Sequence, residues 1–332
     1  MNASPSQGMF YVDRQGKRCV DLAAGLVSCL GYQHPAIVNA ITQACQLPLA
    51  SPTQSEDRPL SERLGEPFET FASSHLFASA NEANEFALRV VRSHFGGDRY
   101  RVISLLGSDH GDTFLLRSLG GRIEQQGSDG PVAAGFRHVM PGEIDALTKA
   151  IDDSTAAVCI SPVNWNRGGE AFDGEYLAGV EAVCREKNLL LVVDETKIPP
   201  GVGGQWFFHQ RAGLTPDLVT LSAGWFGGLA GGLALVGDQV RHNQSLHQCF
   251  RMQEAIAAAT AKTLRDGKQL QSLDETADAW AAMLDELAGG FDFIRECVHA
   301  GLWTTIEVDL PAAEVAHQAQ REGVQVRVTG DS

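Results

Sequence analysis

The sequence predicts an α/β fold with a mainly parallel central sheet that carries helices on both faces. Between about residues 60 and 237, helix-like stretches alternate with short apolar strands, and this alternation is typical of such a sheet. The chain has 332 residues, 44% of them hydrophobic, which is enough for one large domain and a smaller one. Ligands of such sheets bind beyond the carboxyl ends of the strands, so we expect the functional site there.

The expected elements follow in order along the chain. Residues 10–22 predict two short strands around the turn Arg14-Gln15-Gly16, and residues 35–46 predict a helix. The alternating region then predicts helices at 82–95 and 174–187 and strands at 101–106, 156–161, 189–193, 217–221 and 232–236.

The C-terminal part has a different pattern. Residues 254–288 are helical in period and rich in Ala, Leu and Glu. A strand at 302–308, a helix at 311–322 and a strand at 324–328 predict a small α+β domain. We therefore divide the chain into an N-terminal segment (1–34), a large α/β domain (35–240), and an interdomain helix with a small domain (241–332).

Composition excludes several classes of function. The net charge is −15, from 41 acidic and 26 basic residues, which argues against a nucleic-acid partner. Seven scattered cysteines without a C-x-x-C pair indicate reduced thiols. No apolar run approaches the roughly 18 residues of a membrane span, and the N-terminus lacks a secretory pattern. The histidines show no metal-ligand spacing such as H-E-x-x-H. We expect a cytoplasmic protein without a metal site.

Several stretches carry the motifs of one known family. Residues 194–224 read DETKIPPGVGGQWFFHQRAGLTPDLVTLSAG and align without a gap with Asp-Glu-Val-Gln-Thr-Gly and, further on, Thr-Pro-Asp-(Ile/Leu)-Val-Thr-Leu-Ala-Lys-Gly. Residues 79–85 resemble Ser-Gly-Thr-Glu-Ala-Asn-Glu, residues 107–111 resemble a segment with aromatic-His-Gly, and residues 326–330 resemble Arg/Asn-x-Thr-Gly. The chain thus resembles the class III pyridoxal-phosphate-dependent aminotransferases, in particular those of the acetylornithine and succinylornithine type.

This resemblance implies the pyridoxal-phosphate fold type I scaffold, here with a small domain that is shortened at its C-terminal end. It also implies a dimer, because the family's site is built from both subunits. Asp194 stands where the family has the aspartate that pairs with the cofactor's pyridinium nitrogen. Ala223 stands where the family has the lysine that forms the Schiff base and moves the substrate proton. Ordinary transamination would therefore lack both its covalent anchor and its acid/base group.

Other positions of the cofactor site depart from the family in the same way. Ser79 remains from the phosphate-binding Ser-Gly-Thr, but Ala80 and Asn81 replace the next two residues. Asn81 is then either a helix cap or a phosphate ligand. Asp109 replaces the aromatic that stacks on the ring, directly before His110 of the same segment.

Lys197 replaces the glutamine that binds the phenolic oxygen of the cofactor. Two interpretations stay open: a loop lysine beside Asp194 and Glu195, or an amine that reaches the aldehyde carbon or a bound anion. The loop at 161–169 lacks both family glutamates, and residues 245–251 align with the loop that the partner subunit contributes, without its phosphate-binding threonine.

Two functions follow from these departures. The first is a pseudoenzyme with a binding or regulatory role, in a homodimer or in a heterodimer with an aminotransferase homologue. The alternative is an enzyme with altered chemistry, which binds pyridoxal phosphate or another small anionic ligand through Lys197 and Asp194. In both cases binding of the cofactor is weakened or lost, and the sequence names no substrate. An altered and shortened chain is a third interpretation.

Overall fold

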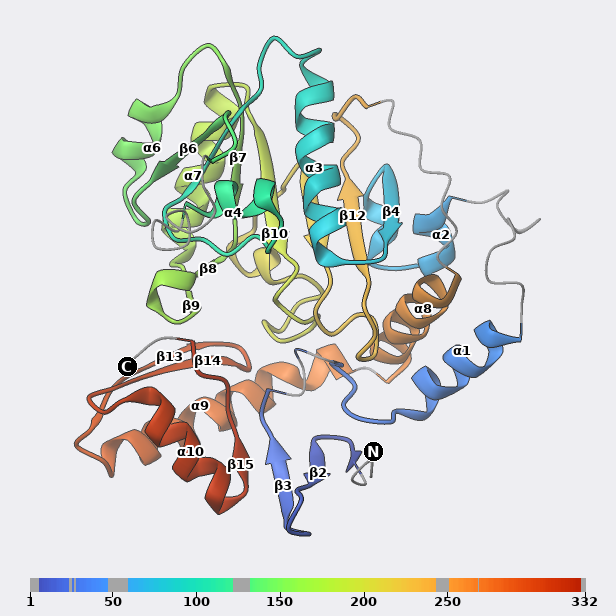
Figure 1. Ribbon diagram of the computed structural model, residues 1–332, viewed down its shortest axis with the longest axis vertical. Helices are drawn as coiled ribbons and strands as arrows, with labels where there is room; N and C mark the ends of the chain where they lie inside the picture. The colour runs from blue at the N-terminus through green and yellow to red at the C-terminus, as the bar shows by residue number, and fades with distance from the viewer. Residues whose placement is uncertain are drawn as a thin grey trace.

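The computed structural model describes residues 6–23, 26, 28–46, 59–121, 132–242, 251–267 and 269–329. Its centre is a seven-stranded sheet in the order β4-β12-β11-β10-β7-β5-β6 (Figure 1). Strand β12 runs antiparallel to both of its neighbours, and the other strands pair in parallel. The predicted mainly parallel α/β fold is confirmed. The strands are β4 (Ser73–Phe77), β5 (Arg101–Leu105), β6 (Phe136–Val139), β7 (Thr155–Ile160), β10 (Leu190–Glu195), β11 (Leu218–Leu221) and β12 (Gly232–Val236).

Helices cover both faces of this sheet. Because successive strand residues point to opposite faces, Val102 packs in the core under α3 (Ala80–His94) and α4 (Phe114–Gly120), while Ile103 packs under α6 (Ile144–Ala150) and α7 (Gly174–Glu186). A third cluster joins the sheet to α2 (Leu60–Leu64) and α8 (Arg251–Asp266). The sheet is thereby buried on both sides, as its apolar strands require.

Helix α3 brings the first motif to the carboxyl edge of the sheet. Its cap is Ser79, whose Oγ accepts a hydrogen bond from the backbone N–H of Glu82 at 3.3 Å. The Glu82 carboxylate in turn accepts from the N–H of Ala78 at 2.8 Å. These reciprocal bonds satisfy N–H groups that the first turn leaves without partners.

The remaining elements form smaller units. Strands β1 (Ser6–Gln7), β2 (Phe10–Val12) and β3 (Arg18–Asp21) form one sheet with β15 (Val324–Gln325), so the two end regions of the described chain meet (Figure 1). Strands β13 (Ile294–Ala300) and β14 (Trp303–Val308) form a hairpin against α9 (Leu273–Gly289). The other elements are α1 (Pro35–Cys45), α10 (Ala312–Glu322), β8 (Val163–Asn164) and β9 (Glu170–Ala171).

Three sequence predictions need correction here. The single helical stretch expected at 254–288 is two helices, α8 and α9, separated by a turn at Gly267 and a short 3-10 segment. The strand expected at 324–328 pairs only over Val324–Gln325. The hairpin strand β13 was not expected, because its sequence, IRECVHA, mixes charged and apolar residues. Within the described residues, no helix is both long and apolar enough to cross a membrane.

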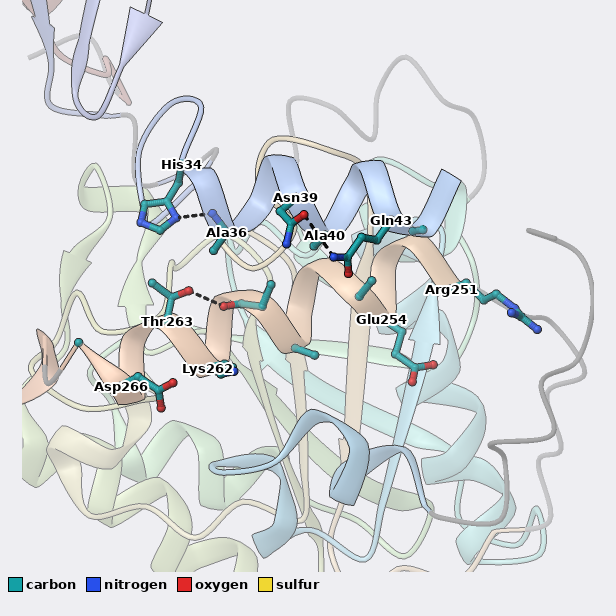
Figure 2. A pocket seen from close by; sticks show the side chains of 15 residues that line it. His34, Ala36, Asn39, Ala40, Gln43, Arg251, Glu254, Lys262, Thr263 and Asp266 are labelled. Carbon is teal, nitrogen blue, oxygen red and sulfur yellow. Dashed lines mark hydrogen bonds between the residues drawn. The ribbon is translucent and has the colours of Figure 1, made fainter. Parts of the chain in front are cut away.

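A surface groove of about 860 Å³ lies between α1 and α8 (Figure 2). Small side chains line it, among them Ala40, Ala255 and Ala259, together with side chains of both charges. Of the described residues that line it, none belongs to the motifs at 79–85, 107–111 or 194–224. The groove is therefore a feature separate from the motif residues.

Candidate cofactor-type site at the end of strand β10

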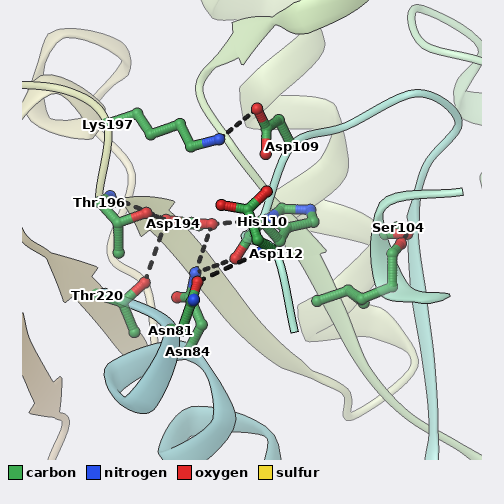
Figure 3. A network of polar contacts seen from close by, with 11 residues as sticks. Asn81, Asn84, Ser104, Asp109, His110, Asp112, Asp194, Thr196, Lys197 and Thr220 are labelled. Atoms are coloured by element: carbon green, nitrogen blue, oxygen red, sulfur yellow. Dashed lines mark hydrogen bonds and ion pairs between the residues drawn. The ribbon is translucent and has the colours of Figure 1, made fainter. Parts of the chain in front are cut away.

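Asp194 lies near the carboxyl end of β10, and only 3% of its surface is exposed. Its Oδ2 accepts hydrogen bonds from Asn84 Nδ2 at 2.9 Å and from His110 Nδ1 at 2.7 Å (Figure 3). Its Oδ1 accepts from the backbone N–H of Thr196 at 2.9 Å and from the Thr196 hydroxyl at 2.6 Å. We call Asp194, Asn84, His110 and Thr196 the floor of the site. A buried carboxylate with this many donors is stable without any further partner.

Distant parts of the chain build the floor. Asn84 is buried in α3, and its amide also donates to the backbone carbonyl of His110 at 2.7 Å, which ties the helix to the 107–111 segment. Gly111 follows with a φ of +129°, and a Cβ there would lie 2.3 Å from Asn81 Oδ1. Only glycine allows the loop to pass so close to the helix.

Asn81 of the first motif contacts the loop that follows the 107–111 segment. Its Oδ1 accepts from the backbone N–H of Asp112 at 3.3 Å, so the side chain holds the loop. The prediction that Asn81 caps the helix is wrong, because Ser79 occupies the cap position and its hydroxyl already binds the first turn. Ala80 is the first helical residue.

Lys197 and Asp109 lie next to the floor and form an ion pair with each other (Figure 3). Their side chains are 26% and 21% exposed, so solvent reaches both. Lys197 Nζ also lies 5.8 Å from the ring centroid of Trp165. We call Lys197 and Asp109 the mouth of the site. Two positions that depart from the family motif therefore contact each other, and they carry opposite charges.

Lys197 lies in the turn directly after β10, and its ion pair is with Asp109. The carboxylates of Asp194 and Glu195 are both buried and both engaged elsewhere. Glu195 accepts from the backbone N–H groups of Phe208 and His209 at 2.9 and 2.7 Å, and from His209 Nδ1 at 2.7 Å. Glu195 thereby fixes the segment after β10, and Asp109 is the carboxylate that Lys197 contacts.

Ala223 lies in the turn after β11, the strand that pairs with β10. Its backbone N–H donates to the carbonyl of Thr196 at 2.8 Å, which places it beside the floor. Its side chain is a methyl group and offers no amine. The preceding Ser222 donates its hydroxyl to the carbonyl of Gly231 at 2.6 Å, so that hydroxyl stabilises the turn before β12.

The thiol of Cys159, close to Asp194, is not an activated nucleophile. Burial, reinforced by the nearby carboxylate of Asp194, raises the pKa of the Cys159 thiol well above its ordinary value, so this thiol stays protonated. The described part of the chain contains no group of three or more His, Cys, Asp or Glu side chains that could hold a metal ion. The expected partner-subunit loop at 245–251 lies outside the described residues, except for Arg251.

Sequence reasoning identified Asp194, His110, Asp109, Lys197 and Ala223 as site residues, and the structure brings these together. It overlooked three others that bind Asp194: Asn84, Thr196 and, at 3.4 Å, Thr220. A usable signal was present for Asn84, since a polar residue among buried Ala83, Phe86 and Ala87 requires a partner.

Comparison with known proteins finds the family that the motifs resemble. The family described as "Aminotransferase class-III" matches residues 1–332. The acetylornithine aminotransferase of Caldanaerobacter subterraneus is 28% identical, over 96% of this chain and 85% of its own length. That of Brucella melitensis is 34% identical, over 69% of this chain and 59% of its own length.

Solved structures show the same fold. The ornithine aminotransferase of Toxoplasma gondii superposes with a TM-score of 0.87 at 22% identity, over 99% of this chain and 83% of that chain. A Bacillus anthracis aminotransferase gives a TM-score of 0.86 at 19% identity, over 100% of this chain and 86% of that chain. With a family match over the whole chain and a shared architecture, this chain belongs to the class III aminotransferase family.

Proposed function

We propose that this protein is a class III aminotransferase homologue that binds a ligand without transaminating it, and that it acts in the cytoplasm. The observation that carries the proposal is the ion pair between Lys197 and Asp109. By the motif alignment, these residues stand where the family has the glutamine that binds the phenolic oxygen and the aromatic that stacks on the ring. The positive charge of Lys197 and the negative charge of Asp109 thus pair with each other.

The residues at the site do not fit an imine-linked pyridoxal phosphate. Ala223 has no amine to form the imine. Asp109 presents a carboxylate in place of an aromatic face. The amine of Lys197, the lysine of the 194–224 motif, is engaged in an ion pair with Asp109. Asp194 has a structural role that needs no cofactor, because four donor groups of the floor converge on it.

Titration of the purified protein with pyridoxal phosphate tests the proposal, followed by borohydride reduction and peptide mass analysis. We expect no saturable imine absorbance and no reduced adduct. Ala223→Lys is the matched variant, and restoring this one amine should leave aminotransferase turnover undetectable, since Asp109 and Lys197 still occupy the mouth. A large recovery of turnover in Ala223→Lys would overturn the proposal.

The alternative, an enzyme with altered chemistry, rests on the presence of an amine at Lys197. It makes the opposite prediction in the same experiment: an imine band, and a reduced adduct on the peptide that contains Lys197. Lys197→Met would abolish that adduct. An adduct that persists in Lys197→Met would identify a different lysine and would support neither function.

The groove between α1 and α8 supports a dimer with a second copy of this chain. Its small side chains let a second backbone approach closely. Its charged residues include two bases, Arg251 and Lys262, and two acids, Glu254 and Asp266. We propose that this surface meets its own copy across a two-fold axis. Ala258→Trp fills this groove and should convert the dimer into a monomer in sedimentation analysis. An unchanged sedimentation coefficient would place the partner surface elsewhere.

A further inference from the structure

We propose that one side of α9 is a docking surface for a basic amphipathic helix of a partner protein. The surface consists of Met283, Leu287 and Phe291, the last of them just beyond the C-terminal end of the helix. We call these three residues the α9 stripe. The inference goes beyond the proposed function, because none of the three belongs to the floor or the mouth of the site.

The α9 stripe is apolar and largely open to solvent. Met283 is 52% exposed, and Leu287 and Phe291 are each 47% exposed. Met283 and Leu287 are four residues apart, so they follow one another along the same side of the helix at a rise of about 1.5 Å per residue. The structure describes α9 over its full length, and Leu284 is its one buried residue. Adjacent exposed apolar side chains of this size are typical of a surface that binds another protein.

The hairpin beside α9 extends this surface. Helix α9 packs on β13 (Figure 1), and Trp280, one helical turn before Met283, donates its Nε1–H to Thr304 Oγ1 of β14 at 2.9 Å. The α9 stripe therefore lies on the side of the helix that is turned towards β14. Ile306 faces the same side of β14 as Thr304, because alternate strand residues share a face, and it is 38% exposed.

The charge around the α9 stripe decides the kind of partner. Residues 273–310, which include α9 and the hairpin, contain nine acidic residues and a single Lys or Arg, Arg295. More than half of the net charge of −15 is thus concentrated in this stretch. Arg295 is itself engaged, in ion pairs with Glu307 and Asp309. Such a surface favours a basic partner and repels an acidic one.

The acids of α9 gain little from the chain itself. Asp285 contacts His299 at 3.1 Å, whereas Glu275, Asp278 and Glu286 form no ion pair with any residue that the structure describes. The last turn of α9 contains Glu286 and no base, although the negative end of the helix dipole favours a base there. Lysine or arginine side chains of a partner would relieve this repulsion.

The geometry of the surface favours a helix as the partner. Side chains four residues apart form a ridge on α9, and a second helix packs its own ridges beside it. Glu286 lies next to Met283 on the helix surface, three residues away. A partner helix with apolar residues at helical spacing and bases along their border therefore meets both the α9 stripe and its acidic edge.

Synthetic peptides test the inference by fluorescence anisotropy at physiological salt. The first contains Leu and Lys with Leu at helical spacing, in about 16 residues, which is long enough to form a helix on binding. The second has the same composition in an order that breaks the apolar face. The first should bind at least about tenfold more tightly than the second, and a third peptide with Glu in place of Lys should not bind measurably. Equal binding of the first two would overturn the inference.

Variants of the whole chain test the apolar part of the surface. Met283→Ser together with Leu287→Ser should weaken binding of the first peptide at least about tenfold. Met140→Ser, at an equally exposed methionine after β6, should leave it unchanged. Self-association of the purified protein that the double variant abolishes would assign the α9 stripe to a second copy of this chain and would overturn the inference. The pyridoxal phosphate titration should be the same in these variants as in wild type, so the proposed function is tested separately.

A matched pair of charge variants tests the acidic part. Glu275→Gln with Glu286→Gln should weaken binding of the first peptide severalfold and reduce its dependence on salt. Asp98→Asn with Asp112→Asn removes the same net charge at exposed acids elsewhere and should leave binding close to wild type. Equal losses in the two double variants would reduce the binding to attraction by net charge and would overturn the inference.

Discussion

The floor and the mouth of the site lie side by side, yet they differ in what holds them in place. Asp194 and His110 in the floor are 3% and 1% exposed, and each is bound to residues from other elements. Lys197 and Asp109 in the mouth are 26% and 21% exposed, and their ion pair is with each other. We therefore expect a substitution in the floor to disturb several elements at once, and a paired substitution in the mouth to disturb mainly the Lys197–Asp109 ion pair.

This difference explains why one family residue is present while its neighbours are replaced. Asp194 matches the aspartate that binds the cofactor ring in the family, but here it accepts hydrogen bonds from Asn84, His110 and Thr196. Without it, each of these buried donors would lose a hydrogen bond, and only the amide of Asn84 would keep another acceptor, the carbonyl of His110. Its presence is therefore accounted for by folding stability, and it is not by itself a sign of retained catalysis.

The largest effect should come from removing the centre of the floor. Asp194→Ala leaves the Nδ1 of His110 and the hydroxyl of Thr196 without their acceptor, and the amide of Asn84 keeps only its bond to the carbonyl of His110. We expect a loss of at least about 3 kcal/mol in the free energy of unfolding, measured by urea denaturation. Asp112→Ala is the exposed control and should stay close to wild type. A loss below about 1 kcal/mol in Asp194→Ala would show that the floor does not support the fold.

A half-buried histidine, His75, sharpens the comparison. His75 in β4 has Ser73 and His242 as neighbours, and burial, followed by the nearby His242, lowers its pKa from 6.5 to about 4. The unfolded chain binds this proton near pH 6.5 and the folded chain only near pH 4. The stability from His75 is therefore complete above pH 6.5 and is lost as the pH falls towards 4.

Urea denaturation at pH 7 and pH 4.5 measures this effect. Wild type should lose roughly 2–3 kcal/mol more than His75→Gln over that interval, because the variant has no titrating group at this position. Equal losses in the two proteins would contradict the assignment.

Much of the large domain was predictable from the sequence alone. Strand β12 was predicted residue for residue, because its five residues form a buried apolar run between glycine-rich turns. Strand β4 was not recognised, since it begins Ser73-Ser74-His75 and owes its conformation to pairing with β12. Tertiary pairing of this kind overrides the local preference of polar residues.

The sequence predicted residues that belong to the site, but only part of the contacts between them. The motif alignment identified Asp194, His110 and Ala223, which depend on local order along the chain. The Lys197–Asp109 ion pair was not predicted, because it joins two loops that follow different strands, β10 and β5. One sequence gives no sign that two substitutions compensate each other. The geometry of the sheet edge is needed to show it.

A smaller effect should follow from changing the helix cap beside the floor. Ser79→Ala removes the acceptor of the Glu82 N–H and should cost about 1 kcal/mol in the free energy of unfolding. Asn81→Ala is the informative companion, since its side chain holds the loop at Asp112 and is not the cap. If Asn81→Ala weakened helix α3 more than Ser79→Ala did, measured by hydrogen exchange of the first turn, the assignment of the cap would be wrong.

The smallest effect should come from the mouth itself. Lys197→Met and Asp109→Asn each break an ion pair that solvent reaches, and such pairs contribute roughly 0–1 kcal/mol to stability. In a double-mutant cycle we expect a coupling energy of less than about 1 kcal/mol, which decreases further at high salt. A coupling of about 3 kcal/mol or more would place the pair with the floor, as a structural contact. A weak coupling would mean that the ion pair of the mouth contributes little to the stability of the fold, whereas the floor contributes much.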